Sequence, residues 1–269
     1  MFRNEYNYFL TALQFLTRIQ VPAHYRFQPS YLQASVRYLP LVGQIVAALG
    51  VLAYLICSKW LGTELAILAY MLATIYITGA FHEDGWADTC DAFGGGYDKE
   101  QVLRIMKDSR LGTYGTIGLI GILATKFLLL RELPGYAPAG LRPSLNPLLN
   151  YKTFVLLALA AHGCSRWMGT VVMQRLDYVS GEGKSKPMAT EKPGAMPLLL
   201  GGAFAVWPLL FLPPWFLLVL PPMLLAAWQM SNWFRARIGG YSGDCLGAVQ
   251  QLTEIVFYLA ALILWRYIV

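Results

Sequence analysis

Residues 81–96 read FHEDGWADTCDAFGGG and directly follow a long apolar run. This acid-rich segment contains four carboxylates, and no Lys or Arg follows it before Lys99. If the segment is helical, Asp84, Asp88 and Asp91 lie on one face within an arc of roughly 60°, because each residue advances a helix by about 100°. Stacked carboxylates repel one another unless a cation lies between them. Oxygen ligands without thiolates favour a hard cation, so the segment predicts a Mg²⁺ site.

A simpler interpretation is a helix that begins with acids because its N-terminus carries a partial positive charge. That interpretation would explain Glu83 and Asp84, but not the acids further along the helix. The neighbouring His82 is a candidate general base or a hydrogen-bond donor to the carboxylates, and its alternative role is structural. The glycine triplet at the end of the segment provides a place for the helix to stop.

The composition of the chain around this segment is that of a membrane protein. Of its 269 residues, 57% are hydrophobic and 13% are charged, about half the charged share of roughly 25% in soluble domains. Several apolar runs approach or exceed the roughly 18–20 residues that cross a bilayer. The four cysteines have no paired spacing, which predicts neither a disulfide framework nor a thiolate metal site. We therefore expect an all-α, polytopic helix bundle that forms a single membrane-embedded catalytic domain over residues 1–269, without a cleavable signal sequence.

The apolar runs predict about seven transmembrane helices. They lie near residues 41–58, 63–81, 111–130, 153–174, 197–212, 215–234 and 247–268. Prolines crowd the fifth and sixth, which favours a kinked or re-entrant pair, since neighbouring helices can satisfy the carbonyls that proline frees. Ahead of these spans, an apolar stripe over residues 5–20 is too short to cross a bilayer. It predicts an interfacial or bundle-docked helix that ends before Pro22.

The distribution of basic residues predicts the orientation of the chain in the membrane. With a cytoplasmic N-terminus, fourteen Lys and Arg residues fall in connections on the cytoplasmic side and five on the opposite side. This bias follows the positive-inside rule. It places the acid-rich segment and the connections near residues 98–110, 175–195 and 235–246 together at the cytoplasmic face.

Residues 104–115, RIMKDSRLGTYG, form a basic segment that leads into the third predicted span. Its guanidinium and ammonium groups can neutralise anionic oxygens, and its glycines leave backbone N–H groups free at a helix start. An acid within the segment can complete a metal site or hold a nucleophile. The alternative is a juxtamembrane anchor that contacts lipid phosphates. The candidate residues for substrate binding here are Arg104, Lys107, Asp108, Ser109 and Arg110.

Residues 239–248, GGYSGDCLGA, precede the last predicted span and form a glycine-rich loop before a helix N-terminus. Ser242, Gly243 and Asp244 are candidates to line a substrate pocket, although Asp244 can equally be the N-cap of that helix. Arg166 lies deep in an apolar run, where a charge is costly unless it faces a polar cavity or a paired carboxylate. A structural ion pair and a contact to substrate both remain open for Arg166.

Together these features predict a polar pocket between helices at the cytoplasmic face, with ligands for a hard metal ion opposite basic groups. This chemistry suits displacement at phosphorus, because a cation offsets the developing charge while arginines hold the leaving group. The membrane location implies a lipid or another bulky amphiphilic substrate.

Three motifs occur in order across nearly the whole chain. They are His82-x-Asp84-Gly85-x-x-Asp88-x-x-Asp91, Arg104-x-Met106-Lys107-Asp108-Ser109-Arg110-x-Gly112-x-x-Gly115 and Ser242-Gly243-Asp244-x-Leu246-Gly247-Ala248. This set resembles the motifs of the cobalamin synthase family. The resemblance implies that adenosylcobinamide-GDP and α-ribazole, or α-ribazole 5′-phosphate, are joined with release of GMP in adenosylcobalamin (vitamin B12) biosynthesis. It also implies dependence on Mg²⁺, a location in the bacterial cytoplasmic (inner) membrane, and attack of a ribose hydroxyl on the phosphorus bonded to the cobinamide arm.

The resemblance and the mechanism together assign roles to the candidate residues. The metal ligands are Asp84, Asp88 and Asp91, with Glu83 and Asp108 as further candidates. The catalytic set is Asp84, Asp88, Asp91 and His82, and the group that takes the proton of the nucleophile is left undecided. The candidates for substrate binding are Arg104, Lys107, Asp108, Ser109, Arg110, Arg166, Ser242, Gly243 and Asp244.

Two other functions fit parts of the same pattern. The spacing Asp88-x-x-Asp91 is similar to that of the CDP-alcohol phosphotransferases, so a phospholipid phosphotransferase is the alternative within the same class. A cation-coupled secondary transporter would explain the polytopic architecture, the proline-broken helices and Arg166. Against it, the carboxylates lie at the start of a cytoplasmic connection rather than at the membrane midplane, and no internal repeat is evident.

The expected partners follow from the same interpretation. We expect small-molecule substrates and contact with membrane lipid, and no nucleic acid. A homo-oligomer and a complex with other enzymes of the corrinoid pathway are both left open.

Overall fold

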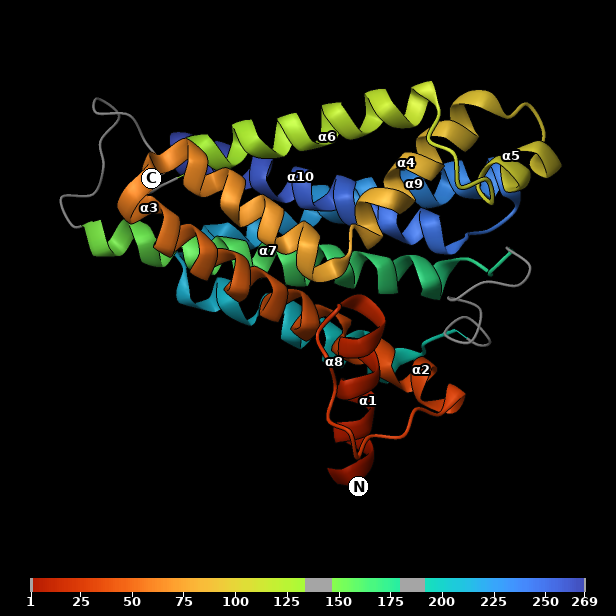
Figure 1. The fold of residues 1–269 in the computed structure, drawn as a ribbon, viewed down its shortest axis with the longest axis horizontal. Coiled ribbons are helices and arrows are strands. Elements are labelled where there is room, and N and C mark those ends of the chain that lie inside the picture. Colours follow the sequence, from red (N-terminus) through yellow and green to blue (C-terminus); the bar gives the residue numbers. More distant parts are fainter. Residues whose placement is uncertain (1, 134–146, 180–191, 269) are drawn as a thin grey trace.

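The protein is an all-α bundle in the computed structural model, which describes residues 2–133, 147–179 and 192–268. Every regular element within those ranges is a helix, apart from an isolated bridge between Tyr178 and Tyr241. The long helices lie along one common direction, and α1 stands across it at one side of the bundle (Figure 1). The predicted fold class is confirmed.

Ten α-helices and three short 3₁₀ helices make up the described part of the chain. The α-helices are α1 (Phe2–Leu16), α2 (Pro29–Ser35), α3 (Leu39–Thr78), α4 (Phe81–Gly95), α5 (Lys99–Ile105), α6 (Thr113–Glu132), α7 (Pro147–Arg175), α8 (Ala195–Val206), α9 (Leu220–Ile238) and α10 (Gly243–Ile268). The 3₁₀ helices are η1 (Val36–Tyr38), η3 (Trp207–Phe211) and η4 (Pro214–Val219).

Helix α3 is folded back on itself at Gly62. This glycine has φ 76° and ψ 175°, a conformation that residues with a side chain adopt only under strain, and the chain reverses its direction there. The two legs then pack closely. A Cβ atom added at Gly50 would lie 2.6 Å from Cγ2 of Thr74 and 3.0 Å from Cδ2 of Tyr70. The first two predicted spans are therefore present as the two legs of a hairpin (Figure 1).

Five helical segments in the described chain are long and apolar enough to cross a membrane. They are Pro29–Thr78, Thr113–Glu132, Lys152–Arg175, Pro214–Ile238 and Gly243–Tyr267. The first contains both legs of the α3 hairpin, and a shorter apolar helix covers Ala195–Phe211. The two legs, the four other long segments and the shorter helix correspond to the predicted spans. Large apolar side chains such as Leu72, Ile117 and Ile120 are exposed on them, as expected for helices that face lipid.

The proline-rich region forms the kinked pair that the sequence predicts. Helix α8 continues into η3, which contains Pro208, and α9 is preceded by η4, which starts at Pro214. The fixed backbone angle and missing N–H of proline favour such short, tight turns over a continuous α-helix.

The N-terminal helix differs from the predicted range of 5–20. Helix α1 ends at Leu16, because the chain then crosses to the end of α3, where the Arg18 N–H donates to the Ile77 carbonyl at 2.8 Å. The guanidinium of Arg18 lies over the ring of Tyr76 at 5.6 Å, a favourable place for a cation at a helix C-terminus. The interfacial location of α1 stays a prediction.

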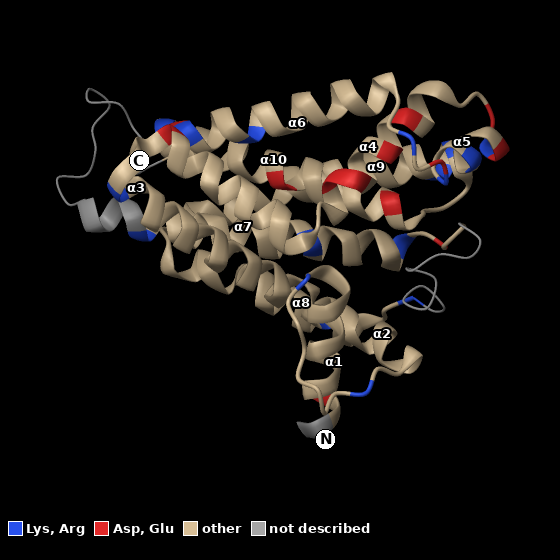
Figure 2. Cartoon of the chain, viewed as in Figure 1, with Lys and Arg blue, Asp and Glu red and all other residues tan. Residues whose placement is uncertain are grey.

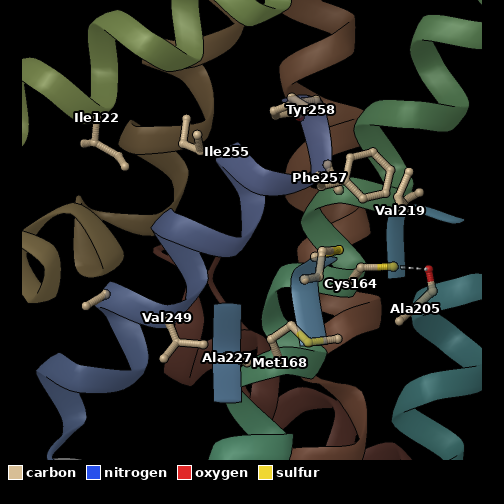
Figure 3. Packing of buried hydrophobic residues seen from close by; sticks show 14 of the residues in the cluster. Ile122, Cys164, Met168, Ala205, Val219, Ala227, Val249, Ile255, Phe257 and Tyr258 are labelled. Carbon is tan, nitrogen blue, oxygen red and sulfur yellow. Dashed lines mark hydrogen bonds between the residues drawn. The ribbon is translucent and has the colours of Figure 1, made fainter. Parts of the chain in front are cut away.

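Helices α7 and α10 lie in the packed interior of the bundle. Ala158, Ala161 and Cys164 of α7 are fully buried, and such small residues let neighbouring helices approach closely. Figure 3 shows Cys164 pointing toward α8, where its Sγ lies 3.4 Å from the carbonyl oxygen of Ala205. On the α10 side, Val249 is fully buried as well. This close packing holds α10 in place against α4, and these two helices carry the candidate site.

Candidate active site

Helices α4 and α10 approach each other very closely near the start of each helix. A Cβ atom added at Gly85 would lie 2.9 Å from the carbonyl oxygen of Asp244 and 3.2 Å from Cα of Gly247, so this crossing requires glycine. The turn into α4 is equally tight, because Gly79 and Ala80 both have left-handed backbone angles. As a result, the start of α10 lies beside the acidic face of α4.

The predicted helical face carries Asp84, Asp88 and Asp91, and the fold places Asp244 next to it. Asp84 is exposed, and the other three are partly buried. Burial and the nearby charges of Asp84, Asp244 and Asp91 raise the pKa of Asp88 from 3.8 to about 7. A bound cation would strongly stabilise the ionised form of a carboxyl group that lies among other acids in this way. These four residues are called the aspartate cluster below.

Asp91 also binds the N-terminus of α6. Its carboxylate oxygens accept hydrogen bonds from the backbone N–H groups of Gly112 and Gly115, at 2.7 and 2.8 Å. A side chain at either glycine would collide with this carboxylate. The sequence predicts that the N–H groups at this helix start are free to bind the anionic oxygens of a ligand or a lipid. For these two groups the prediction is wrong, because a carboxylate of the protein itself occupies them.

Glu83 is turned away from the aspartate cluster. Its side chain is buried, and Oε1 accepts a hydrogen bond from Nε2 of Gln251 at 2.9 Å. The second oxygen, Oε2, has no hydrogen-bond partner among the described residues. The structure thus brings three of the five candidate metal ligands to one face and directs Glu83 into the bundle.

In the basic segment, Asp108 and Arg110 pair with each other. Arg110 Nη2 lies 2.6 Å from Asp108 Oδ2, and Arg110 Nε lies 2.9 Å from Asp108 Oδ1. These hydrogen bonds hold the pKa of Asp108 at about 2, below its ordinary value. Asp108 is therefore not brought together with the aspartate cluster. Arg104, Lys107 and Ser109 are exposed, and Figure 2 shows basic residues around α5 at the same end of the bundle as the acids of α4.

Ser242, rather than Asp244, is the N-cap of α10. The hydroxyl of Ser242 accepts a hydrogen bond from the backbone N–H of Cys245 at 3.3 Å and can donate to Asp244 Oδ2 at 3.4 Å. The same hydroxyl lies 3.5 Å from the sulfur of Met106 in the basic segment. Because Ser242 caps the helix, the Asp244 carboxylate is not needed as the cap and can face α4. Gly243 lies between Ser242 and Asp244 in the chain.

A second polar group, absent from the predictions made from the sequence, lies inside the bundle. Glu254 lies 3.3 Å from Nζ of Lys126 and 3.4 Å from Nε2 of His162, and all three side chains are buried. Gln250 donates to Glu254 at 2.7 Å, and Gln251 accepts from Lys126 at 3.0 Å. We call these five residues the buried polar network. The signal in the sequence is a charge at positions 126 and 254 within otherwise apolar runs.

His82 and Arg166 lie at the edge of this network, and both are buried. Arg166 Nη1 donates to the carbonyl of His162 at 3.0 Å, while Arg166 Nε has no hydrogen-bond partner in the described chain. Within the described ranges Arg166 forms no direct ion pair, so one of the two roles left open for it, the structural ion pair, is not seen. Burial, helped by the charges of Arg166 and Lys126, lowers the pKa of His82 well below its ordinary value, so the ring is neutral.

An apolar cavity opens beside His82 and Arg166, with a volume of about 560 Å³ including its mouth. The elements around it are α1, the start of α3, α4, α7 and α10 with the residues just before it. Its apolar lining includes Phe15, Leu16, Phe81, Met173 and Leu246. Gly243 also lines the cavity, which therefore reaches the start of α10 next to Asp244.

Lys184 and Lys186, basic residues of the predicted 175–195 connection, lie outside the described residues.

Comparisons with known proteins give one consistent result. A model of the family described as cobalamin-5-phosphate synthase matches residues 8–262. A relative named adenosylcobinamide-GDP ribazoletransferase, from Leptospira interrogans, is 37% identical over 98% of both chains. Relatives of the same name from Shewanella amazonensis and Ralstonia pickettii are 35% and 39% identical. The former match covers 98% of both chains, and the latter covers 95% of this chain and 92% of the relative. No solved structure matches the chain.

Proposed function

The chain belongs to the cobalamin-5-phosphate synthase family, and on this basis we propose that it joins adenosylcobinamide-GDP to α-ribazole, or to α-ribazole 5′-phosphate, with release of GMP. It is a transferase of cobalamin synthesis, as the names of its full-length relatives and the description of its family state.

The observation that carries this proposal is the convergence of the three sequence motifs on the aspartate cluster. Asp91 of the first motif binds the backbone of Gly112 in the second. Ser242 of the third motif contacts Met106 of the second, and Gly85 of the first packs on Asp244 of the third. Four carboxylates and an exposed basic segment therefore lie at one end of the bundle (Figure 2).

A divalent cation suits the chemistry of the aspartate cluster. Its side chains offer only carboxylate oxygens, the ligands that Mg²⁺ prefers, and the raised pKa of Asp88 shows how unfavourable the uncompensated charges are. We assign Asp84, Asp88 and Asp244 as ligands, with Asp91 oriented by α6. Among the described residues, no three His, Cys, Asp or Glu side chains are already arranged around one point, so these carboxylates must turn toward each other to bind. Once bound, Mg²⁺ supplies positive charge that stabilises the diphosphate and the leaving group.

The reaction is a displacement at the phosphorus that carries the cobinamide arm. The ribose hydroxyl oxygen of the acceptor forms a bond to this phosphorus, and the bond from the phosphorus to the bridging oxygen breaks. GMP leaves with that oxygen, while the hydroxyl proton passes to a base. The neutral ring of His82 is a candidate for this base, and so is a carboxylate of the aspartate cluster that is not bound to the cation. Arg104 and Lys107 are exposed beside the site and bind the phosphates of the GDP group.

We place this site at the cytoplasmic face of the bacterial inner membrane. The excess of basic residues in alternate connections supports this orientation. An odd number of spans puts the two ends of the chain on opposite sides of the membrane. A tag at the C-terminus should then report the periplasm. A cytoplasmic report from that tag would contradict the orientation.

The proposal is tested by reconstituting the protein in liposomes with adenosylcobinamide-GDP, α-ribazole and Mg²⁺ and measuring GMP. Asp88→Ala should reduce the rate at least about a hundredfold, since it removes a ligand of the cation that stabilises the developing charge. Asp177→Ala is the matched control, because Asp177 is an exposed acid that pairs with Lys192 at 3.3 Å, outside the aspartate cluster.

Two results would overturn the proposal. A near-wild-type rate for Asp88→Ala would show that the aspartate cluster does not perform the chemistry. Turnover of a CDP-alcohol, without GMP release from the corrinoid donor, would assign the same site to a phospholipid phosphotransferase.

A further inference from the structure

The apolar cavity between α1, α4, α7 and α10 is suited to a compact, flat, apolar ligand. The rings of Phe15 and Phe81 form part of its wall and meet edge to face, with centroids 5.5 Å apart. Leu39 and Met173 add aliphatic surface.

One residue of the lining shows that the space is open rather than filled by neighbouring side chains. Gly169 of α7 is buried, yet a Cβ atom added there would meet no atom within 4 Å. A buried glycine in the interior of a helix normally packs against something. Gly43, by contrast, would place a Cβ atom only 3.0 Å from Nε of Arg166. Gly169 therefore marks the position where the interior of the bundle has room for a ligand.

The cavity also contains the polar groups that would orient such a ligand. His82 and Arg166 line it, and both residues are buried. Polar side chains of this kind in an otherwise apolar cavity can orient a ligand that carries a hydrogen-bond acceptor. An acyl chain has no such acceptor along its length.

The position of the cavity connects it to the reaction. Phe81 is one helical turn before Asp84, a rise of about 4.5 Å along α4. Gly243 is adjacent to Asp244 on α10, and it too lines the cavity. A molecule in the cavity therefore has one end close to the aspartate cluster.

We propose that this cavity is the subsite for the aromatic base of the acceptor nucleoside, with the ribose directed toward the aspartate cluster. The inference rests on the proposed function, which supplies α-ribazole, a benzimidazole nucleoside, as acceptor. A benzimidazole ring is flat and largely apolar, and its nitrogen can accept a hydrogen bond from Arg166 or His82. The corrinoid is a large macrocycle with many amide groups, and an apolar cavity with so few polar partners would leave those amides unsatisfied.

Filling the cavity at Gly169 tests the inference. Gly169→Ala and Gly169→Leu should raise the KM for α-ribazole in graded steps, to about tenfold or more for Leu, because methylene-sized changes in an apolar pocket have effects of that order. The KM for adenosylcobinamide-GDP should stay within about twofold. A riboside of the smaller imidazole base should lose less affinity in Gly169→Leu: its KM should rise by a smaller factor than the KM for α-ribazole.

Gly121→Leu is the matched control. Gly121 lies on α6, is exposed, and likewise has no atom within 4 Å of an added Cβ, but it is not part of the cavity lining. It therefore experiences the same change in helix propensity and should leave both KM values unchanged. A wild-type rate of Gly169→Leu at saturating α-ribazole confirms that the variant is folded.

Two results would overturn the inference. One is an unchanged KM for α-ribazole in Gly169→Leu, and the other is an equal rise of both KM values, which would assign the cavity to the donor. Equilibrium binding of α-ribazole without donor, followed by the fluorescence of its base, separates this inference from the proposed function. If the wild type releases no GMP but binds α-ribazole and Gly169→Leu does not, the proposed reaction fails while the base subsite stands.

Discussion

The buried ion pair between Lys126 and Glu254 allows a quantitative test of how this bundle is stabilised. The two side chains are 7% and 1% exposed, and Nζ lies 3.3 Å from Oε1. Lys126→Met keeps the shape of the side chain but leaves the Glu254 carboxylate without its closest cation. Removing one partner of a buried pair costs about 3–5 kcal/mol, and we expect this loss in the free energy of unfolding.

The double variant Lys126→Met/Glu254→Gln should recover much of this stability, because it leaves no uncompensated charge in the interior. In Glu254→Gln alone, Lys126 keeps its hydrogen bond to Gln251 Oε1 at 3.0 Å but loses its counter-charge. The two single losses should therefore exceed the loss of the double variant by about 2–3 kcal/mol.

The assay is reversible unfolding in mixed detergent micelles with increasing dodecyl sulfate, followed by far-ultraviolet circular dichroism. The exposed pair Glu64–Arg131 is the control, with 3.6 Å between Oε1 and Nε and side chains 59% and 47% exposed. Its disruption should cost at most about 1 kcal/mol. If the losses of Lys126→Met and Glu254→Gln add up within about 0.5 kcal/mol, the two side chains do not act as a pair and the reasoning is refuted.

Three further predictions concern the aspartate cluster and the hairpin. Asp91→Ala removes both acceptors at the start of α6 and should cost about 1–2 kcal/mol, with faster hydrogen exchange at Gly112 and Gly115; unchanged exchange there would contradict the cap. Because the pKa of Asp88 is raised to about 7, Mg²⁺ must displace a proton below that pH. In calorimetric titrations, the affinity for Mg²⁺ should fall up to tenfold for each pH unit below about 7 and should be constant above it. An affinity that does not change with pH would exclude this carboxyl as a ligand. Without metal, the same raised pKa makes the fold less stable as the pH rises from about 4 to about 7. Gly62→Ala should cost about 1–2 kcal/mol through backbone strain alone, since no atom lies within 4 Å of the added Cβ, whereas Gly121→Ala should cost nothing; equal stability of the two variants would contradict the strained turn.

The sequence alone determined the features that depend on the faces and ends of single helices. The apolar runs specified the long helices, because each must be long and apolar enough to face lipid. The spacing of Asp84, Asp88 and Asp91 put them on one helical face, because 3.6 residues per turn is a local property. The glycines after Phe93 ended α4 at Gly95 for an equally local reason.

Only the tertiary structure decided which group lies opposite each of those faces. Asp244 joined the aspartate cluster because Gly85 lets α10 approach, and Glu83 turned inward because Gln251 lies on that side. The pairing of Lys126 with Glu254 and the cavity at Gly169 likewise depend on how separate helices pack. Periodicity describes how a helix presents its own side chains, whereas the identity of the neighbour is set by the packing of segments far apart in the chain.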